Sequence, residues 1–163
     1  MDVKTSIADL KIIIREWSIQ SWTKEWEKET DPNQEKPKCR QTKYFYKVPD
    51  KQKAKVLLGY NRDNLSMLVR FVTGHAFLKR HNKIVERGTK IGEENEDIYC
   101  RLCSSNTEWE TPHHLICKCE ALMHRRKEIF GDFFLPDDPK WDIKNLMDFL
   151  NCSTITDLED DEE

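Results

Sequence analysis

The feature that most constrains this sequence is a cluster of cysteine and histidine residues between positions 100 and 119. Cys100 and Cys103 form a C-x2-C pair, and His114 and Cys119 extend the spacing to C-x2-C-x10-H-x4-C. A C-x2-C turn brings two thiolates close together, and zinc takes four sulfur or nitrogen ligands arranged as a tetrahedron. The preferred interpretation is a CCHC zinc knuckle in which Cys100, Cys103, His114 and Cys119 are the ligands.

Two alternatives stand beside this assignment. His113 and Cys117 are a rival second pair, because they lie at i and i+4 of a helix. A redox role for the C-x2-C pair is less favoured, because the pair lacks a βαβ setting. Four protein ligands would leave no open coordination position, so the zinc is predicted to be structural and not to activate water.

The expected cellular location depends on the first apolar segment of the chain. Charged residues interrupt this segment at Lys11, Arg15 and Glu16. Such a segment is not typical of a secretory signal, so the expected location is intracellular, in the nucleus and/or cytoplasm. No run of 18 apolar residues predicts a membrane span.

Catalysis is not expected from the motifs of this chain. The sequence contains no glycine-rich phosphate loop and no G-x-S-x-G elbow. The segment 135–138, Leu-Pro-Asp-Asp, resembles a polymerase double-aspartate motif, but its proline is incompatible with the strand hairpin that such a motif needs. We therefore expect a protein that is not an enzyme.

Charge is unevenly distributed along the 163 residues, although the overall net charge is only −3. Residues 36–90 contain fifteen Lys or Arg against three acidic residues, a net of +12. A basic segment of this kind is typical of proteins that bind the phosphates of RNA or DNA. The candidate nucleic-acid-binding residues are Lys43, Lys47, Lys51, Lys53, Lys55, Arg70, Lys79, Arg80, Lys83 and Arg87.

Apolar periodicity predicts a mostly α-helical small domain. A tryptophan-rich helix is expected over residues 6–29, where Ile7, Leu10, Ile14 and Trp17 are spaced three and four apart and Trp22 and Trp26 continue the pattern. Its tryptophans are interpreted as core or partner contacts in preference to base-stacking groups. Residues 43–48 are expected to be a short strand or an extended segment.

An αα-hairpin is expected around Gly74, with helices over about 57–72 and 76–87, followed by helices over about 120–130 and 141–150. Six acidic residues among positions 157–163 predict a disordered C-terminus. The expected organisation is residues 1–50 as the tryptophan helix and a polar linker, residues 51–151 as the hairpin with the zinc knuckle, and residues 152–163 as the acidic tail.

A motif of glycine, histidine, cysteine and arginine residues spans the middle of the chain. Its members are Thr73-Gly74-His75, Leu78, His81, Gly88, Cys100-Arg101-Leu102-Cys103, Glu110-Thr111, His114-Leu115, Cys119, Ala121-Leu122, Arg126 and Gly131. This combined motif resembles the C-terminal region of non-LTR, LINE-type retrotransposon reverse transcriptase polyproteins, most closely the jockey-like elements. In that family the region follows the RNase H domain.

The resemblance implies a CCHC zinc module that helps to hold RNA or DNA, with the same four ligands that the spacing favours. Cys117 departs from the family pattern as an additional thiol. The chain itself carries no polymerase, endonuclease or complete RNase H domain, so it looks like a detached terminal piece. The alternative function is a protein–protein interaction module that docks through the tryptophan-rich helix.

Overall fold

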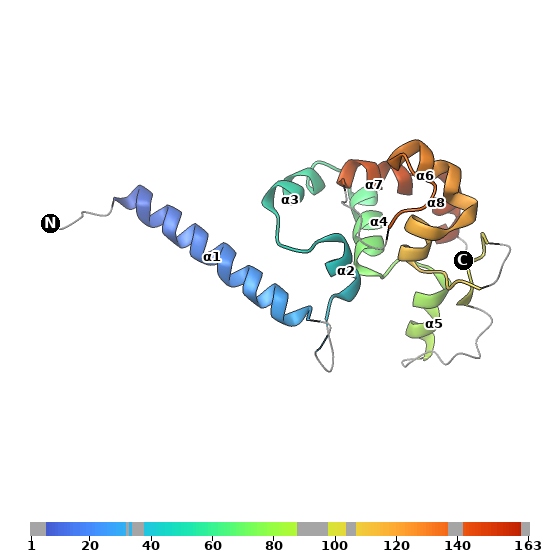
Figure 1. Ribbon diagram of the computed structural model, residues 1–163, viewed down its shortest axis with the longest axis horizontal. Coiled ribbons are helices and arrows are strands. Elements are labelled where there is room, and N and C mark those ends of the chain that lie inside the picture. Colours follow the sequence, from blue (N-terminus) through green and yellow to red (C-terminus); the bar gives the residue numbers. More distant parts are fainter. Residues whose placement is uncertain are drawn as a thin grey trace. The chain divides into compact units, whose positions relative to one another are not determined.

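The computed structural model divides into two compact units, residues 1–51 and residues 52–163, and each unit is described by itself. The described parts of the chain are mostly helical, which confirms the expected fold class (Figure 1). Within the described residues, no helix combines the length and the apolar character that crossing a membrane requires. The structure describes residues 6–31, 33, 38–87, 98–103, 107–136 and 142–160.

The first unit is built on the long helix α1, Ile7–Glu29, which confirms the helix predicted over 6–29. A capping box begins it: Ser6 Oγ accepts a hydrogen bond from the Asp9 backbone N–H at 3.1 Å, and the Asp9 carboxylate accepts from the Ser6 N–H at 3.0 Å. Both hydrogen bonds satisfy N–H groups that the first turn of a helix leaves without partners.

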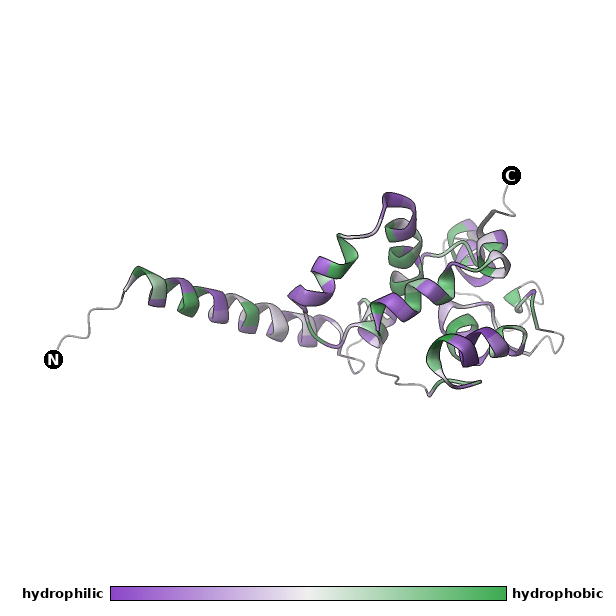
Figure 2. Ribbon diagram, turned by 90° about the horizontal axis from the view of Figure 1, so that it is seen from above, coloured by the Kyte–Doolittle hydropathy of each residue, from purple (hydrophilic) through white to green (hydrophobic). Residues whose placement is uncertain are grey.

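The apolar residues of α1 form two stripes instead of the single stripe that the sequence suggested. Five residues separate Trp17 from Trp22, so the second side chain is rotated by about 140° around the helix axis. All of α1 is described and none of its residues is buried; Trp17 is 67% exposed and Trp22 is 57% exposed. The interpretation of these tryptophans as core residues is therefore wrong, and apolar and polar residues alternate along α1 in Figure 2.

The chain after α1 folds back onto the end of that helix. The indole N–H of Trp26 donates a hydrogen bond to the Lys47 carbonyl at 3.0 Å. Residues 43–48 do not form the expected strand, because the short helix α2, Arg40–Phe45, takes the first three of them. The expected extended conformation is found only after the helix, at Tyr46. A helix satisfies its backbone locally, whereas a strand needs a neighbouring strand, and the described residues around this segment supply none.

The second unit contains the hydrophobic core. Its helices come in chain order, with a π-helical turn and a 3₁₀ turn between the fifth and sixth α-helices. They are α3, Lys51–Leu57; α4, Arg62–Thr73; α5, Lys79–Arg87; η2, His114–Lys118; η3, Glu120–Leu122; α6, Met123–Phe130; α7, Ile143–Leu150; and α8, Ser153–Asp160.

Particular residues fix both ends of helix α4. The Asn61 side chain caps its start by accepting a hydrogen bond from the Asn64 N–H at 2.9 Å. Gly74 ends it in the left-handed conformation at φ 80°, where a Cβ would be strained. Helices α4 and α5 flank Gly74 as predicted, but the predicted helices start too early, because Asn61 caps α4 and α5 begins only at Lys79. Helix α4 packs mainly against α7.

The core forms where α4, α6 and α7 meet. Phe71 on α4 and Phe149 on α7 are fully buried, and the Phe149 ring lies 5.5 Å from the ring of Phe130 on α6. Apolar residues at three- and four-residue steps of α7 all face this core, which is why the segment forms a helix. They are Ile143, Leu146, Met147, Phe149 and Leu150.

The disordered acidic C-terminus is not confirmed. Residues of the expected tail form helix α8 up to Asp160, and residues 161–163 lie outside the described residues. Ile155 is fully buried and Leu158 is 5% exposed. These two apolar side chains, three residues apart, give the acidic segment a buried face that outweighs the mutual repulsion of its carboxylates.

Substitution of Ile155 with Ala tests this packing. We expect the free energy of unfolding, measured by urea denaturation, to fall by about 2 kcal/mol, because a buried branched side chain is lost and a cavity remains. The exposed neighbour Thr154→Ala is the matched control and should change stability by less than about 0.5 kcal/mol. Equal stability of the two variants would show that α8 contributes no packing.

Candidate metal centre

A short chain reversal positions the first two thiols of the centre. Tyr99 and Trp109 form an isolated antiparallel bridge, and the Cys100 N–H donates to the Glu108 carbonyl at 2.9 Å. This pairing holds the segment around Cys100 against the segment around residue 109. The turn that follows Cys100 brings Cys103 back toward it, as the C-x2-C spacing requires.

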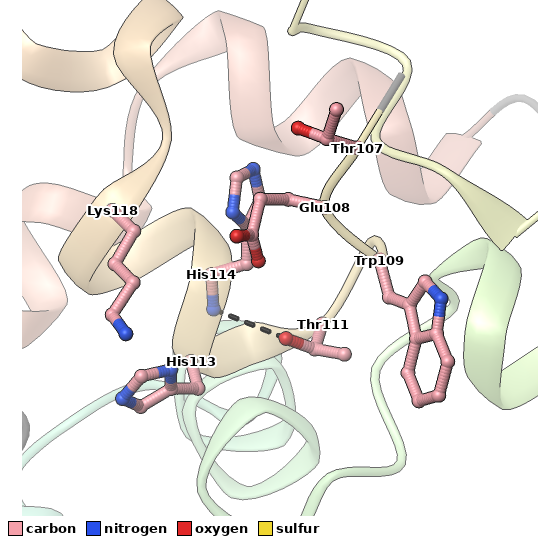
Figure 3. A pocket seen from close by; sticks show the side chains of 7 residues that line it. All are labelled: Thr107, Glu108, Trp109, Thr111, His113, His114 and Lys118. Carbon is pink, nitrogen blue, oxygen red and sulfur yellow. Dashed lines mark hydrogen bonds between the residues drawn. The ribbon is translucent and has the colours of Figure 1, made fainter. Parts of the chain in front are cut away.

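A π-helical turn positions the other two donors. The Thr111 hydroxyl accepts a hydrogen bond from the His114 N–H at 3.1 Å at the start of this turn (Figure 3). The Cys119 N–H then donates to the His114 carbonyl at 2.8 Å, which is an i to i+5 hydrogen bond. This hydrogen bond brings Cys119, the residue after the π-helical turn, back to His114, and the donor atoms of the two residues converge.

The four donor atoms of Cys100, Cys103, His114 and Cys119 lie within 4.8 Å of one another, and all four residues are buried. The Cys103 Sγ lies 3.2 Å from His114 Nε2 and 3.4 Å from the Cys119 Sγ. The Cys100 Sγ lies 4.0 Å from the Cys119 Sγ. All six cysteines of the chain are free thiols, so the predicted donors meet as a cluster that could hold a metal ion.

The rival pair does not take part in this cluster. Cys117 is fully buried but its thiol is not among the converging donors, and His113 is only half buried. His113 lies before the π-helical turn, which begins at His114, and Cys117 lies inside it.

Electrostatics within the cluster favour ionisation of one thiol first. The pKa of Cys100 is lowered, chiefly because the Cys119 thiol donates a hydrogen bond to it, with further hydrogen bonds from His114 and from the backbone N–H groups of Leu102 and Cys103. Burial opposes this shift. The pKa of Cys119 is raised by the same contact with Cys100 and by burial. A bound cation would overcome this asymmetry and favour thiolates throughout.

The carboxylate of Glu110 fastens the cysteine turn to two other elements. It is fully buried and accepts hydrogen bonds from the Lys79 N–H at the start of α5, at 3.0 Å, and from the Arg101 N–H, at 2.9 Å. The Arg101 guanidinium forms an ion pair with the same carboxylate at 2.9 Å and donates to the Leu158 carbonyl on α8 at 3.0 Å.

A second buried charge lies against the donor cluster. Arg126 on α6 is fully buried, and its guanidinium donates hydrogen bonds to the carbonyls of Cys119 and Phe133. Burial lowers the pKa of Arg126, while the nearby thiols of Cys119, Cys117 and Cys103 act in the opposite direction. In the sequence, Arg126 and Glu110 stand out only as members of a motif, because burial of a charged residue leaves no periodic signal.

The residues predicted to contact nucleic acid are divided between the two units. Three belong to the first unit and seven to the second, where α5 carries four of them; the side chain of Arg87 lies outside the described residues. In chain order they are Lys43, Lys47 and Lys51 in the first unit, where Lys51 is also the first residue of α3, then Lys53 and Lys55 on α3, Arg70 on α4, and Lys79, Arg80, Lys83 and Arg87 on α5.

Aromatic rings accompany two of these basic residues. The Arg80 guanidinium lies over the ring of Trp109, 5.4 Å from its centroid, and the Arg70 guanidinium lies over Phe77 at 4.9 Å. The former contact connects α5 directly to the segment that carries the metal donors.

Comparison of the chain with protein-family models, with curated proteins and with solved structures gives no match.

The cluster predicts a specific effect of removing one donor. Cys103→Ser should abolish retention of one metal ion per chain in native mass spectrometry and unfold the second unit, because metal binding is part of the folding free energy of such sites. The matched controls are Cys117→Ser, a buried thiol outside the cluster, and Cys152→Ser. Loss of metal in Cys117→Ser with retention in Cys103→Ser would contradict the donor assignment.

The buried carboxylate gives a second prediction. Glu110→Gln should lower the free energy of unfolding by about 3 kcal/mol. The amide N–H of glutamine would point at N–H groups that now donate to the carboxylate, and the Arg101 guanidinium would lose its counter-ion. Urea denaturation measures the effect. Glu128→Gln, which breaks only the exposed pair with Arg125, should cost less than about 1 kcal/mol. Equal costs would show that the Glu110 network is not a central link.

Proposed function

We propose that this chain is a non-catalytic, zinc-stabilised module that binds RNA or DNA, with α5 as the element that contacts phosphates. We further propose that it derives from the C-terminus of a non-LTR retrotransposon reverse transcriptase. The origin is supported by the combined motif from Thr73 to Gly131. The function is supported by the geometry of the donor cluster and by what that cluster is connected to.

Zinc is the ion that suits this donor set. Three thiolates and one imidazole are a common structural zinc combination, and Zn–S bonds of about 2.3 Å place tetrahedral sulfurs about 3.8 Å apart. The two sulfur–sulfur distances to Cys119, 3.4 and 4.0 Å, bracket that value. Four protein donors leave no open position, which favours a structural role over catalysis.

The charge balance also favours a divalent ion. Zinc with three thiolates and a neutral histidine carries a net charge of −1, and an isolated charge is costly to bury. The guanidinium of Arg126, buried behind Cys119, supplies the compensating positive charge.

The connection that carries the functional proposal is Glu110. The same carboxylate binds the backbone of Arg101, between the two knuckle cysteines, and the backbone of Lys79, at the start of α5. Metal binding at the knuckle therefore fixes the direction of the helix that carries Lys79, Arg80 and Lys83. Positive charges held on a rigid helix lose less conformational freedom when they bind phosphates.

A protein-interaction module is the second candidate, and the exposure of α1 favours it. Leu10, Ile14 and Trp17 on one side and Trp22 on another are between 47% and 67% exposed. Large exposed apolar side chains gathered on one helix are typical of surfaces that bind a partner. Contacts of this kind persist at high salt, whereas phosphate contacts weaken.

The salt dependence of binding tests the proposal. We expect the affinity of the full chain for a short single-stranded RNA, measured by fluorescence anisotropy, to fall steeply between 50 and 200 mM salt, as is general for phosphate contacts. Lys79→Ala with Lys83→Ala should weaken binding and reduce the slope of log K against log salt by about 1.4, since each lost contact removes about 0.7.

The matched control is Lys11→Ala with Lys24→Ala, which removes the same charge from α1. It should leave the slope unchanged. Absence of binding at low salt would exclude the nucleic-acid function, and a high-salt-resistant complex with a protein that Trp22→Ala abolishes would favour the alternative.

A further inference from the structure

A pocket of about 240 Å³ lies directly beside the metal centre, because the donor His114 is one of its lining residues (Figure 3). Cavities that hold drug-sized ligands usually measure about 300–1,000 Å³, so this one suits a single flat ring system better than a whole cofactor. The second unit supplies all of its walls.

One wall of the pocket is the indole of Trp109. The ring is 40% exposed, and the Arg80 guanidinium from α5 lies over it at 5.4 Å. The bridge with Tyr99 fixes the backbone from which the indole projects. The cation and the paired backbone hold this large aromatic side chain in place. It can therefore stack on the ring of a ligand and lose little conformational entropy on binding.

The other walls are polar. His113 and Lys118 lie on the side of the pocket opposite Trp109, and Glu108 and Thr107 lie between the two sides (Figure 3). These side chains offer a cation for a phosphate and a carboxylate and a hydroxyl for the donor and acceptor groups on the edge of a ring. An apolar face combined with a polar edge is the recognition pattern of a nucleobase.

We propose that this pocket binds one unpaired nucleobase of a single-stranded nucleic acid, stacked on Trp109, with an adjacent phosphate at Lys118. This inference rests on the proposed nucleic-acid-binding function and names the ligand of that function. Bases within a duplex are already stacked on their neighbours and cannot enter, so the module selects single strands. The basic helix α5, in contact with Trp109 through Arg80, lies where it can bind the phosphates that follow.

The experiment compares the full-length protein with Trp109→Leu, using eight-nucleotide ribo- and deoxyribo-oligonucleotides of the same sequence and a duplex of equal length. We expect Trp109→Leu to weaken binding of both single strands about tenfold to hundredfold, as is usual for loss of one stacked base, and to leave duplex binding unchanged. Trp109→Phe, which retains a smaller aromatic face, should lie between the two.

Phe77→Leu is the matched control, because Phe77 is also 40% exposed and also lies under an arginine, yet is not part of the pocket. It should bind like the unmodified chain. Metal content by native mass spectrometry shows whether each variant is folded. If Trp109→Leu loses its metal, Lys118→Glu, at an exposed position on the opposite wall, replaces it and should also weaken single-strand binding.

The outcomes separate the two proposals. If the unmodified chain binds single strands and the folded Trp109→Leu and Lys118→Glu variants bind equally well, the pocket is not the base site and this inference is overturned, while the proposed function stands. Equal affinity for duplex and single strands would also overturn it. If the unmodified chain binds no nucleic acid at low salt, the proposed function itself fails.

Discussion

The buried carboxylate of Glu110 is the interaction on which the arrangement of the second unit depends. Its oxygens satisfy the backbone between the two knuckle cysteines and the first N–H of α5, and its partner Arg101 reaches the carbonyl of Leu158 on α8. Glu110 and Arg101 together therefore join the cysteine turn to α5 and to α8. A buried carboxylate with so many partners is costly to disrupt, because any rearrangement would leave charge or backbone groups without compensation.

The donor cluster could be predicted from the sequence because the chemistry of metal ligation dictates both residue type and spacing. Cys100 and Cys103 needed only a local turn, and the second pair preferred among neighbouring candidates is the one whose donor atoms meet theirs. The helix α1 could be predicted as well, since its cap Ser6 acts within one turn and leaves a signal in the local sequence. The end of α4 at Gly74 could also be predicted, but its start at Arg62 was placed too early in the sequence.

Other features depend on contacts between distant segments and left no local signal. The aromatic residues of 43–48 favoured a strand by composition, yet no strand partner exists among the described residues, and a helix satisfies the backbone alone. The acidic C-terminal residues suggested disorder because charge dominated the composition, although Ile155 and Leu158 supply a buried face. The contact of Arg80 with Trp109 joins residues whose separation in the sequence hides their proximity.

The π-helical turn between His114 and Cys119 has a consequence for how such chains can change over time. Insertion or deletion of one residue there would change the position of Cys119 around the turn and withdraw its sulfur from the cluster. The connection from Cys103 to Thr107 precedes the paired residue Glu108 and carries no such restriction, because lengthening a connection costs little free energy. Length variation among relatives of this chain should therefore accumulate between Cys103 and Glu108 and be excluded from the four residues that follow His114.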